Sequence, residues 1–297
     1  MKRVVLFSAV CALSVGASAH GQIIMDDFEV DSSSSYTVLD DGNAPSGDGT
    51  PDSTSAFAFD YIAAGIPLAP NSSPGDVGGL RFAANETSAD AGAADHITAF
   101  HNTTIIANSF TVTVDIYMGV ENAGGTTEFA NVGFGSDGTD FNSIFTPIAG
   151  DGHFISMTGD GGSSSDFRHF VEGTPVNSGD SSYLASADGD PNTTNAAGDL
   201  YQAIFAGGDF PGSPGNRWTT LTIDVNPLLT TYSLDGTTII ETATVDSRGQ
   251  IGLGYGDVFS SVGPHFVVFD NLNVVPEPTS LALLGLGALA MLRRRSA

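Results

Sequence analysis

Short stretches in which every second residue is apolar recur along this chain, and they restrict its fold more than any other feature. In 109–118, one face of an extended strand would carry Phe110, Val112, Val114, Ile116 and Met118. The other face would carry Thr111, Thr113, Asp115 and Tyr117. An alternation of period two predicts strands with one face on a core and the other toward solvent.

Further strands are predicted from the same pattern and from β-rich composition. The clearest are 218–225, 231–234, 237–241, 250–255 and 266–274, and weaker candidates are 23–30, 56–61, 79–83, 127–133 and 152–157. Asp235-Gly236 between two of these strands predicts a tight hairpin. No amphipathic helix longer than two turns is visible. Many short strands with Gly-rich turns predict an all-β fold, an antiparallel β-sandwich of the jelly-roll type.

The N-terminus has the order of a secretory signal peptide. A basic start with Lys2 and Arg3 precedes an apolar run, which ends in an Ala-x-Ala motif at Ala17 and Ala19. We expect a signal peptide helix over 1–19, removed by signal peptidase. The alternative, a buried first helix, would place two basic residues in a core. Cys11, the single cysteine, lies in the removed part, so the mature protein is expected to form no disulfide.

The C-terminus combines a short motif, an apolar stretch and a basic cluster. Pro276, Glu277 and Pro278 come first, 281–292 is apolar, and Arg293, Arg294 and Arg295 follow. About a dozen apolar residues form a short hydrophobic helix, less than the usual length of a membrane span. The arginines favour the cytoplasmic side, so the tail would hold the exported part outside.

This order of parts resembles the PEP-CTERM sorting signal. The resemblance covers 276–297 only. It implies processing by an exosortase in the envelope of a Gram-negative-type bacterium, often one that produces exopolysaccharide. The protein would then be secreted to the cell surface or extracellular matrix and transiently anchored by its C-terminal segment. The alternative is an ordinary C-terminal membrane helix.

Between the two ends, 20–275 is long enough for one large β domain, and this domain is strongly acidic. It contains four arginines and no lysine against 33 of the chain's 34 acidic residues. Such a charge excludes binding to nucleic acid or to anionic lipid headgroups through electrostatic attraction. Nineteen Phe and seven Tyr indicate a packed core rather than disorder.

The second half of the domain carries a further resemblance. A strand led by Trp218, the Asp235-Gly236 hairpin and a closing strand with Asp270 follow one another. This order is similar to that of laminin-G or concanavalin A-like jelly rolls and spans about 60 residues. Members of these families bind glycans or proteins, and some cleave polysaccharides, so the resemblance implies a fold and leaves several functions open.

The first and last predicted strands each carry one acidic residue in an apolar row. These residues are Asp26 in 23–30 and Asp270 in 266–274. If both rows face the core, each carboxylate needs a partner, because an unpaired buried charge is costly. A shared structural calcium ion would supply one, since calcium prefers carboxylate and carbonyl oxygens. Alternatively the strands twist, both acids reach water, and Asp27 and Asn271 face inward.

A second calcium candidate lies in 174–215, a Ser-, Gly- and Asp-rich stretch of the length that is usually functional or poorly ordered. Its oxygen ligands would be Asp188, Asp190, Asn192 and Asp199, at the spacing of a helix–loop–helix calcium site. Thr193 stands where such a loop needs glycine, and no flanking helices are visible. A plain solvated loop is the alternative.

No catalytic arrangement is found. Gly179-Asp180-Ser181 resembles the nucleophile block of one esterase family, but it lies in a mid-chain loop. The Glu-x-Asp-x-Glu triplet of polysaccharide-cleaving jelly rolls does not occur, and the histidines have no zinc-ligand spacing. Four aromatic residues in or beside loops are candidate glycan contacts, namely Tyr183, Tyr201, Tyr255 and Phe259.

The sequence therefore predicts an exported, non-catalytic β-sandwich protein that is sorted by an exosortase. Its expected role is to bind glycan, such as exopolysaccharide, or to act as an extracellular scaffold. The alternative function is a polysaccharide-active glycoside hydrolase or lyase with a non-standard acidic site.

Overall fold

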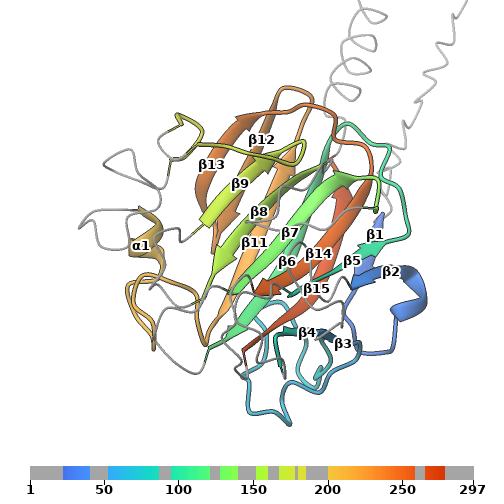
Figure 1. Cartoon of the computed structure of the whole chain (residues 1–297), viewed down its shortest axis with the longest axis vertical. Helices are drawn as coiled ribbons and strands as arrows, with labels where there is room; N and C mark the ends of the chain where they lie inside the picture. The colour runs from blue at the N-terminus through green and yellow to red at the C-terminus, as the bar shows by residue number, and fades with distance from the viewer. Residues whose placement is uncertain are drawn as a thin grey trace, which may run out of the picture.

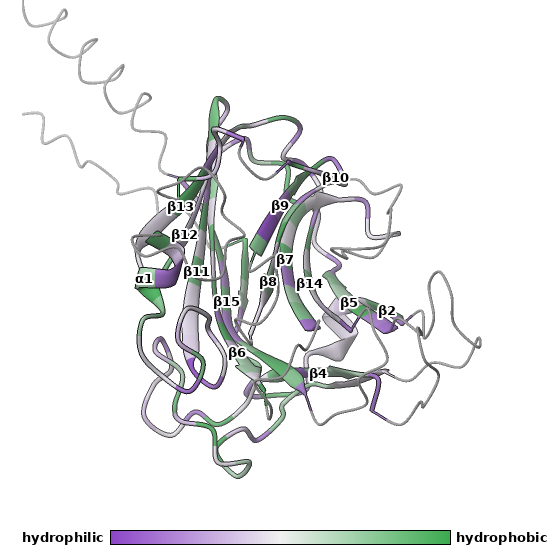
Figure 2. Cartoon of the chain, turned by 60° about the vertical axis from the view of Figure 1, so that its left-hand side comes forward, coloured by the Kyte–Doolittle hydropathy of each residue, from purple (hydrophilic) through white to green (hydrophobic). Residues whose placement is uncertain are grey.

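The computed structural model describes residues 23–40, 53–86, 95–120, 128–139, 152–159, 167–177, 180–184, 200–257 and 265–277. These residues form two antiparallel β-sheets that pack face to face (Figures 1 and 2). The predicted all-β sandwich is confirmed. Within these ranges the helices are η1 (Ser33–Ser35) and α1 (Leu200–Ile204). Neither is long or apolar enough to cross a membrane.

The first sheet contains the strands that the sequence predicts most clearly. Its order is β13 (Thr237–Ala243), β12 (Leu229–Leu234), β11 (Trp218–Val225), β6 (Phe110–Gly119), β15 (Phe266–Pro276), β4 (Leu80–Ala84) and β3 (Ser53–Ala56). The first strand, β1 (Ile24–Asp26), also pairs with β15. The chain therefore begins and closes its sandwich on neighbouring strands.

The second sheet covers one face of the first. Its order is β10 (Thr174–Pro175), β9 (Phe167–Val171), β8 (His153–Thr158), β7 (Glu128–Ser136), β14 (Gln250–Asp257), β5 (Asp95–His101) and β2 (Tyr36–Asp40). Figure 2 shows the two layers from the side, with β11, β6 and β15 in one and β9, β8, β7 and β14 in the other.

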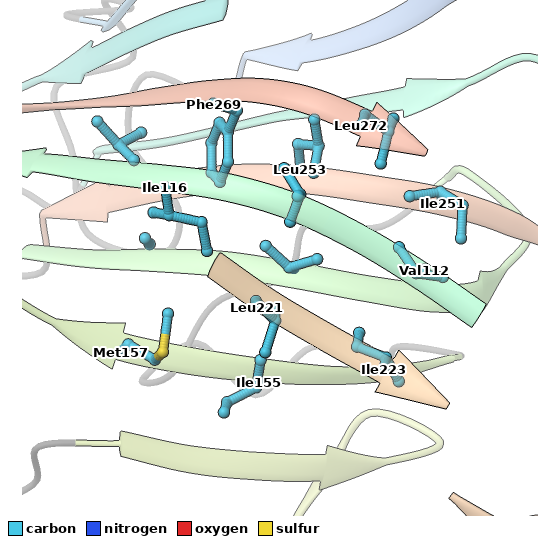
Figure 3. Close-up of a cluster of buried hydrophobic side chains, with 14 of the residues drawn as sticks. Val112, Ile116, Ile155, Met157, Leu221, Ile223, Ile251, Leu253, Phe269 and Leu272 are labelled. Carbon is cyan, nitrogen blue, oxygen red and sulfur yellow. The ribbon is translucent and has the colours of Figure 1, made fainter. Parts of the chain in front are cut away.

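The core between the sheets is built from the alternating apolar rows (Figure 3). The five apolar residues predicted for one face of β6 are all buried there. They face side chains from β8 and β14 such as Ile155, Met157 and Leu253. Each fully buried aliphatic side chain of this kind contributes about 1.5–3 kcal/mol through removal from water. The period-two pattern therefore predicted the core face correctly.

The predicted Asp235-Gly236 hairpin is also confirmed. Asp235 and Gly236 have φ angles of 47° and 79°, and Leu234 pairs with Thr237 across the turn. Two consecutive residues with positive φ form the turn whose twist matches that of the two strands, and Asp-Gly is a favoured pair for it.

Four strands were not predicted, namely β2, β5, β9 and the two-residue β10. β5 and β9 carry polar residues among their apolar ones. In β5, His96 and Thr98 are as buried as Ile97 and Ala99, so the strand shows no polar face. The predicted strand 56–61 is also shifted, because β3 ends at Ala56.

The residues of β15 that face the core change along the strand. The prediction that one unbroken apolar row of 266–274 shares a face is therefore wrong. Val267 and Phe269 face the core between the sheets, whereas Val268 lies in a different cluster. The register then shifts between Asp270 and Asn273, with Asn271 at a φ of 54°. After this bulge the core face continues with Leu272 and Val274. Asp270 therefore points away from the inter-sheet core.

Residues 57–79, the cover segment, lie against the outer face of the first sheet and form a second apolar cluster there. Tyr61 and Ile66 of this segment pack with Tyr117, Trp218 and Val268 of the sheet. The Trp218 indole N–H donates to the Pro67 carbonyl at 2.6 Å. Trp218 is thus a core residue of this outer cluster rather than of the inter-sheet core.

Replacing Leu253 by Ala should lower the free energy of unfolding by about 2–5 kcal/mol, because a fully buried side chain is lost and a cavity remains. Leu228→Ala is the matched control. Its side chain is 83% exposed, and the change should stay within about 0.5 kcal/mol. Urea denaturation of both variants measures the difference. Equal destabilisation by the two changes would contradict the burial of Leu253.

Candidate functional site

A polar cleft of about 570 Å³ opens at one end of the sandwich. Five separate parts of the chain line it: the crossover before β6, the end of β7, the start of β8, the turn after β9 and the segment before β14. The lining residues are Thr104, Gly135, Ser136, Asp137, Gly152, Glu172, Asp246, Arg248, Gly249 and Gln250. This volume falls in the range of small-ligand sites.

Close backbone packing shapes this cleft. Gly249 has a φ of 152°, and a Cβ atom there would lie 2.4 Å from the backbone carbon of Gly135. The backbone of Gly249 is in turn paired with Ile105 through hydrogen bonds of 2.7 and 3.1 Å. Only glycine, which has no Cβ atom, lets the two backbones come this close. The segment before β14 is therefore packed directly against the end of β7.

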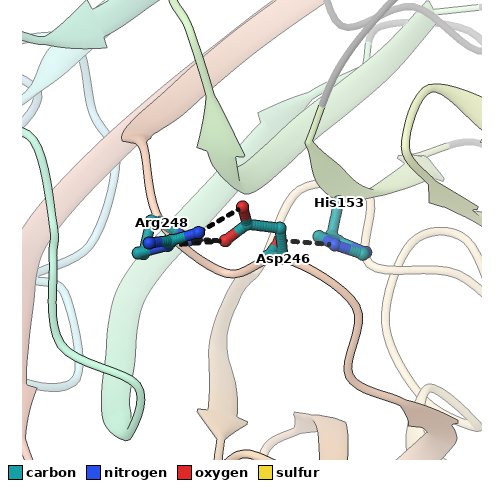
Figure 4. Close-up of polar contacts among 3 residues, drawn as sticks. All are labelled: His153, Asp246 and Arg248. Carbon is teal, nitrogen blue, oxygen red and sulfur yellow. Dashed lines mark hydrogen bonds and ion pairs between the residues drawn. The ribbon is translucent and has the colours of Figure 1, made fainter.

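Asp246 and Arg248 form a two-point ion pair in the cleft (Figure 4). The Arg248 Nε and a terminal guanidinium nitrogen donate to the two Asp246 oxygens at 3.0 and 2.9 Å. Hydrogen bonds from Arg248 lower the pKa of Asp246 to about 2. His153 Nε2 lies 2.9 Å from the Asp246 carbonyl oxygen, and burial lowers the pKa of this histidine. The imidazole is therefore a neutral donor at pH 7 that fixes the backbone beneath the ion pair.

The chemistry of the cleft is that of hydrogen bonding to polar groups. Asp137, Glu172 and Asp246 provide three carboxylates against the single guanidinium of Arg248. Amide and hydroxyl groups add donors and acceptors, and none of the ten lining residues is aromatic. The cleft thus offers both donors and acceptors in an environment of negative charge.

Sequence reasoning did not find this cleft. Its residues come from distant parts of the chain, so no local motif marks them. The available signal was Asp246-Ser-Arg248-Gly249 between two strands, because Arg248 is one of only four arginines in 20–275.

A second polar cluster lies under the cover segment, where Asp115 and Asp270 are register partners on β6 and β15. Both residues are fully buried. Asp270 Oδ2 accepts hydrogen bonds from the hydroxyls of Tyr61, at 3.1 Å, and Ser72, at 2.8 Å. Its Oδ1 accepts from the Asn271 backbone N–H at 2.6 Å. This carboxylate is therefore satisfied by protein donors.

Asp115 is satisfied in the same way. Its oxygens accept from the backbone N–H and the side-chain amide of Asn71 at 3.0 and 2.8 Å. The Thr220 hydroxyl and the Asn271 amide donate at 2.6 and 3.1 Å. Burial, with a smaller contribution from Asp115, raises the pKa of Asp270 to about 6. The two acids hold the cover segment on the sheet.

The structure does not bring Asp26 and Asp270 into one calcium site. Asp26 accepts from the Phe28 N–H and, at 2.9 Å, from the Tyr36 hydroxyl, in a network separate from that of Asp270. Each acid therefore has protein donors of its own, and the two carboxylates share no partner. Within the described ranges, no group of three His, Cys, Asp or Glu residues is placed to hold a metal. The second candidate set, Asp188, Asp190, Asn192 and Asp199, lies outside the described residues.

The predicted aromatic glycan contacts are corrected by burial. Tyr183, Tyr201 and Tyr255 all belong to the core, and their rings pack on neighbours such as Phe167 and Phe205. A ring covered on both faces by protein cannot stack on a sugar. The sequence had placed these tyrosines in or beside loops, with Tyr255 at the end of the predicted strand 250–255. Phe259 lies outside the described residues.

The two ends of the chain are described only in part. β15 ends at Pro276, and the Glu277 N–H donates to the Ser109 carbonyl at 3.1 Å. The remaining sorting and cleavage residues lie outside the described ranges, namely Ala17, Ala19, Pro278, Arg293, Arg294 and Arg295.

Comparison with protein families identifies this C-terminal segment. Residues 274–296 match the PEP-CTERM protein-sorting motif. The chain carries an exosortase sorting signal. The match confirms the resemblance drawn from the sequence, and it indicates a secreted, exosortase-processed and envelope-associated protein. No curated protein matches the PEP-CTERM chain as a relative.

Several solved structures are similar to this chain. The carbohydrate-binding module CBM66 from Bacillus subtilis is 16% identical with a TM-score of 0.36, over 66% of this chain and 86% of that chain. A Bacillus subtilis protein of unknown function with a galectin-like fold is 11% identical with a TM-score of 0.46, over 86% and 96%. A mutant of the Emp46p carbohydrate recognition domain is 12% identical with a TM-score of 0.47, over 86% and 97%. These values are low, and no property of those proteins is transferred to this chain.

Replacing Asp270 by Asn should remove one pH-dependent part of the stability. The pKa of Asp270 is about 6 in the folded protein, above its ordinary value of 3.8, so the folded state binds the Asp270 proton more tightly than the unfolded state does. The free energy of unfolding therefore falls as pH rises from about 4 to about 6, on the order of 2–3 kcal/mol from this group, and then stays level.

Urea titrations between about pH 4 and pH 7 measure this effect as the difference between wild type and Asp270→Asn. Glu241→Gln, at an exposed position on β13, should keep the wild-type profile. A difference between wild type and Asp270→Asn that does not vary with pH would contradict the raised pKa.

Proposed function

We propose that this PEP-CTERM protein is an exported, non-catalytic β-sandwich that binds a neutral glycan in the end cleft. The observation that carries the proposal is the cleft itself. It is open, lined by polar residues and of ligand size, and the Gly249–Gly135 contact holds two of its walls together. Sugar hydroxyls both donate and accept hydrogen bonds, which suits a lining of carboxylates, amide and guanidinium.

The charge of the cleft supports a neutral rather than an acidic glycan. Its carboxylates outnumber its guanidinium three to one, and Asp246 already pairs with that guanidinium. A uronate or sulfate group would meet like charges at short range and lose binding energy. Neutral hydroxyls avoid this repulsion and donate to Glu172 and Asp137.

The non-catalytic assignment rests on the buried acid pair. Asp115 and Asp270 are one pair of neighbouring carboxylates of the kind that a glycoside hydrolase uses, and the pKa of Asp270 is raised. However, both are fully buried under the cover segment, and their oxygens accept hydrogen bonds from protein donors. A structural role accounts for this geometry. Turnover of a polysaccharide panel by the purified protein tests the alternative of a hydrolase or lyase.

The expected processing gives the protein its place at the cell surface. We infer that signal peptidase removes 1–19, that 20–275 is the sandwich domain and that 276–297 is the sorting segment. The segment would hold the domain at the membrane transiently until an exosortase acts on it. Extracellular matrix or exopolysaccharide is then the setting in which the cleft meets its glycan.

Substitutions in the cleft should weaken glycan binding. Glu172→Gln removes a charged acceptor, and Arg248→Ala removes a charged donor and leaves Asp246 unpaired. Each should weaken binding by roughly tenfold or more, since a hydrogen bond to a charged group contributes about 1.5–3 kcal/mol. A glycan array identifies a bound neutral oligosaccharide, and calorimetry measures its affinity for each variant.

Two matched controls separate binding from general effects of charge. Glu241→Gln removes an exposed carboxylate from β13, and Arg217→Ala breaks the surface ion pair with Asp235. Both should bind as the wild type does. Unchanged affinity in the two cleft variants, or a preference for acidic polysaccharide, would overturn the proposed site. No binding on the array would favour the scaffold role.

Calcium enters the proposal only through Asp188, Asp190, Asn192 and Asp199. If these residues hold calcium, chelation with EGTA should lower the melting temperature, because the ion binds the folded state alone. The double change Asp188→Asn with Asp190→Asn should remove that effect of EGTA. A melting temperature that EGTA leaves unchanged in the wild type would end the idea of a structural calcium.

A further inference from the structure

The strand register places several segments at one end of the sandwich. Val225 of β11 and Pro276 of β15 both pair with Phe110, the first residue of β6. The chain before β6, the turn after β11 and the chain that follows β15 therefore leave the first sheet at the same end. The segment before β14 joins them, because Ile105 pairs with Gly249. We call this the tail end, and the cleft opens there too.

The tail end carries exposed apolar side chains. Leu228 is 83% exposed and Ile106 is 80% exposed, the two highest values among the large hydrophobic residues in the described ranges. Val245 is 48% and Leu229 is 36% exposed. The Thr244 N–H donates to the Leu228 carbonyl, so Val245 lies beside this turn. Exposed apolar side chains that cluster at one end of a domain indicate an interaction surface, whereas single exposed apolar side chains scattered over a surface do not.

The short connection between β15 and the apolar tail indicates what this surface contacts. Only residues 277–280 separate Pro276 from the apolar stretch 281–292. Four residues reach at most about 14 Å even when fully extended. The first of them, Glu277, is also held to the Ser109 carbonyl. A tail inserted in a bilayer would therefore keep the tail end close to the lipid surface.

We propose that the tail end rests on the bilayer while the tail is attached, with Leu228, Ile106 and Val245 in the interfacial layer. This inference rests on the membrane-held tail of the proposed function. The partner is an uncharged lipid surface, because carboxylates outnumber the cation at this end. Among the described residues, the charged groups at this end include Asp137, Glu172, Asp224, Asp246, Arg248 and Glu277. Contact with lipid removes apolar surface from water without bringing these acids against anionic headgroups.

Depth-sensitive fluorescence on the mature chain, residues 20–297, tests the proposal. The single cysteine, Cys11, lies in the removed signal segment, so the mature chain accepts one label at a time. An environment-sensitive dye is attached after Leu228→Cys or Ile106→Cys. The control is Ile62→Cys, 40% exposed in the cover segment next to Tyr61, which packs on Trp218 at the opposite end of β11. The protein is reconstituted in phosphatidylcholine vesicles with brominated acyl chains, and flotation shows that the chain is membrane-bound.

The expected result is strong quenching by bromolipid at positions 228 and 106 and none at position 62. Flotation without quenching at 228 and 106 would overturn the proposal and leave the membrane-held tail intact. A chain that does not float would overturn both. Labels at 228 and 106 that are shielded from aqueous iodide but not quenched by bromolipid would show contact with a second copy of the chain, which also overturns the proposal.

Discussion

The pairing of β15 with β6 determines how the rest of this molecule is arranged. β15 lies between β6 and β4 in the first sheet and also pairs with β1, so three strands take their register from it. Its bulge, centred on Asn271, moves the core face from Val267 and Phe269 to Leu272 and Val274. As a result Asp270 faces outward, where it binds the cover segment. The end of the same strand also fixes where the sorting tail leaves the domain.

Much of the fold follows from local sequence patterns, and the exceptions have a common cause. β6 and β11 alternate cleanly because one face of each is apolar and the other mostly polar, and the hairpin turn has a specific backbone requirement. β5 could not be predicted from alternation, because tertiary packing buries its polar residues His96 and Thr98 as fully as its apolar ones. A bulge is equally hard to predict, because a single inserted residue reverses the faces without leaving a mark in composition.

The candidate sites were predictable only in part, because their partners are far apart in sequence. The sequence indicated that Asp270 is a buried carboxylate needing a partner, and this is correct. The partners are Tyr61 and Ser72, separated from it by 209 and 198 positions, and no local pattern connects them. The residues that line the cleft are also far apart in sequence, and backbone contacts between Gly135 and Gly249 bring its walls together. The tyrosines were misplaced for the opposite reason, because a loop-like flanking sequence does not reveal a ring that turns inward.

The shortage of cations explains how this acidic domain is built. Three of its four arginines, Arg81, Arg217 and Arg248, form ion pairs with carboxylates that are partly exposed. Such pairs contribute little to stability, on the order of 0–1 kcal/mol each. The fully buried acids Asp115 and Asp270 are instead satisfied by hydroxyl, amide and backbone donors, which carry no net charge.

The same shortage limits what the cleft can bind. Its one guanidinium is held by Asp246 in a two-point pair, so it offers its remaining N–H groups as donors but little uncompensated positive charge. An anionic ligand would have to displace that pair or approach Asp137 and Glu172 without compensation, and both are costly. A neutral, hydroxyl-rich ligand meets neither cost. In the proposed function, the shortage of cations in this domain therefore also selects the chemical class of the ligand.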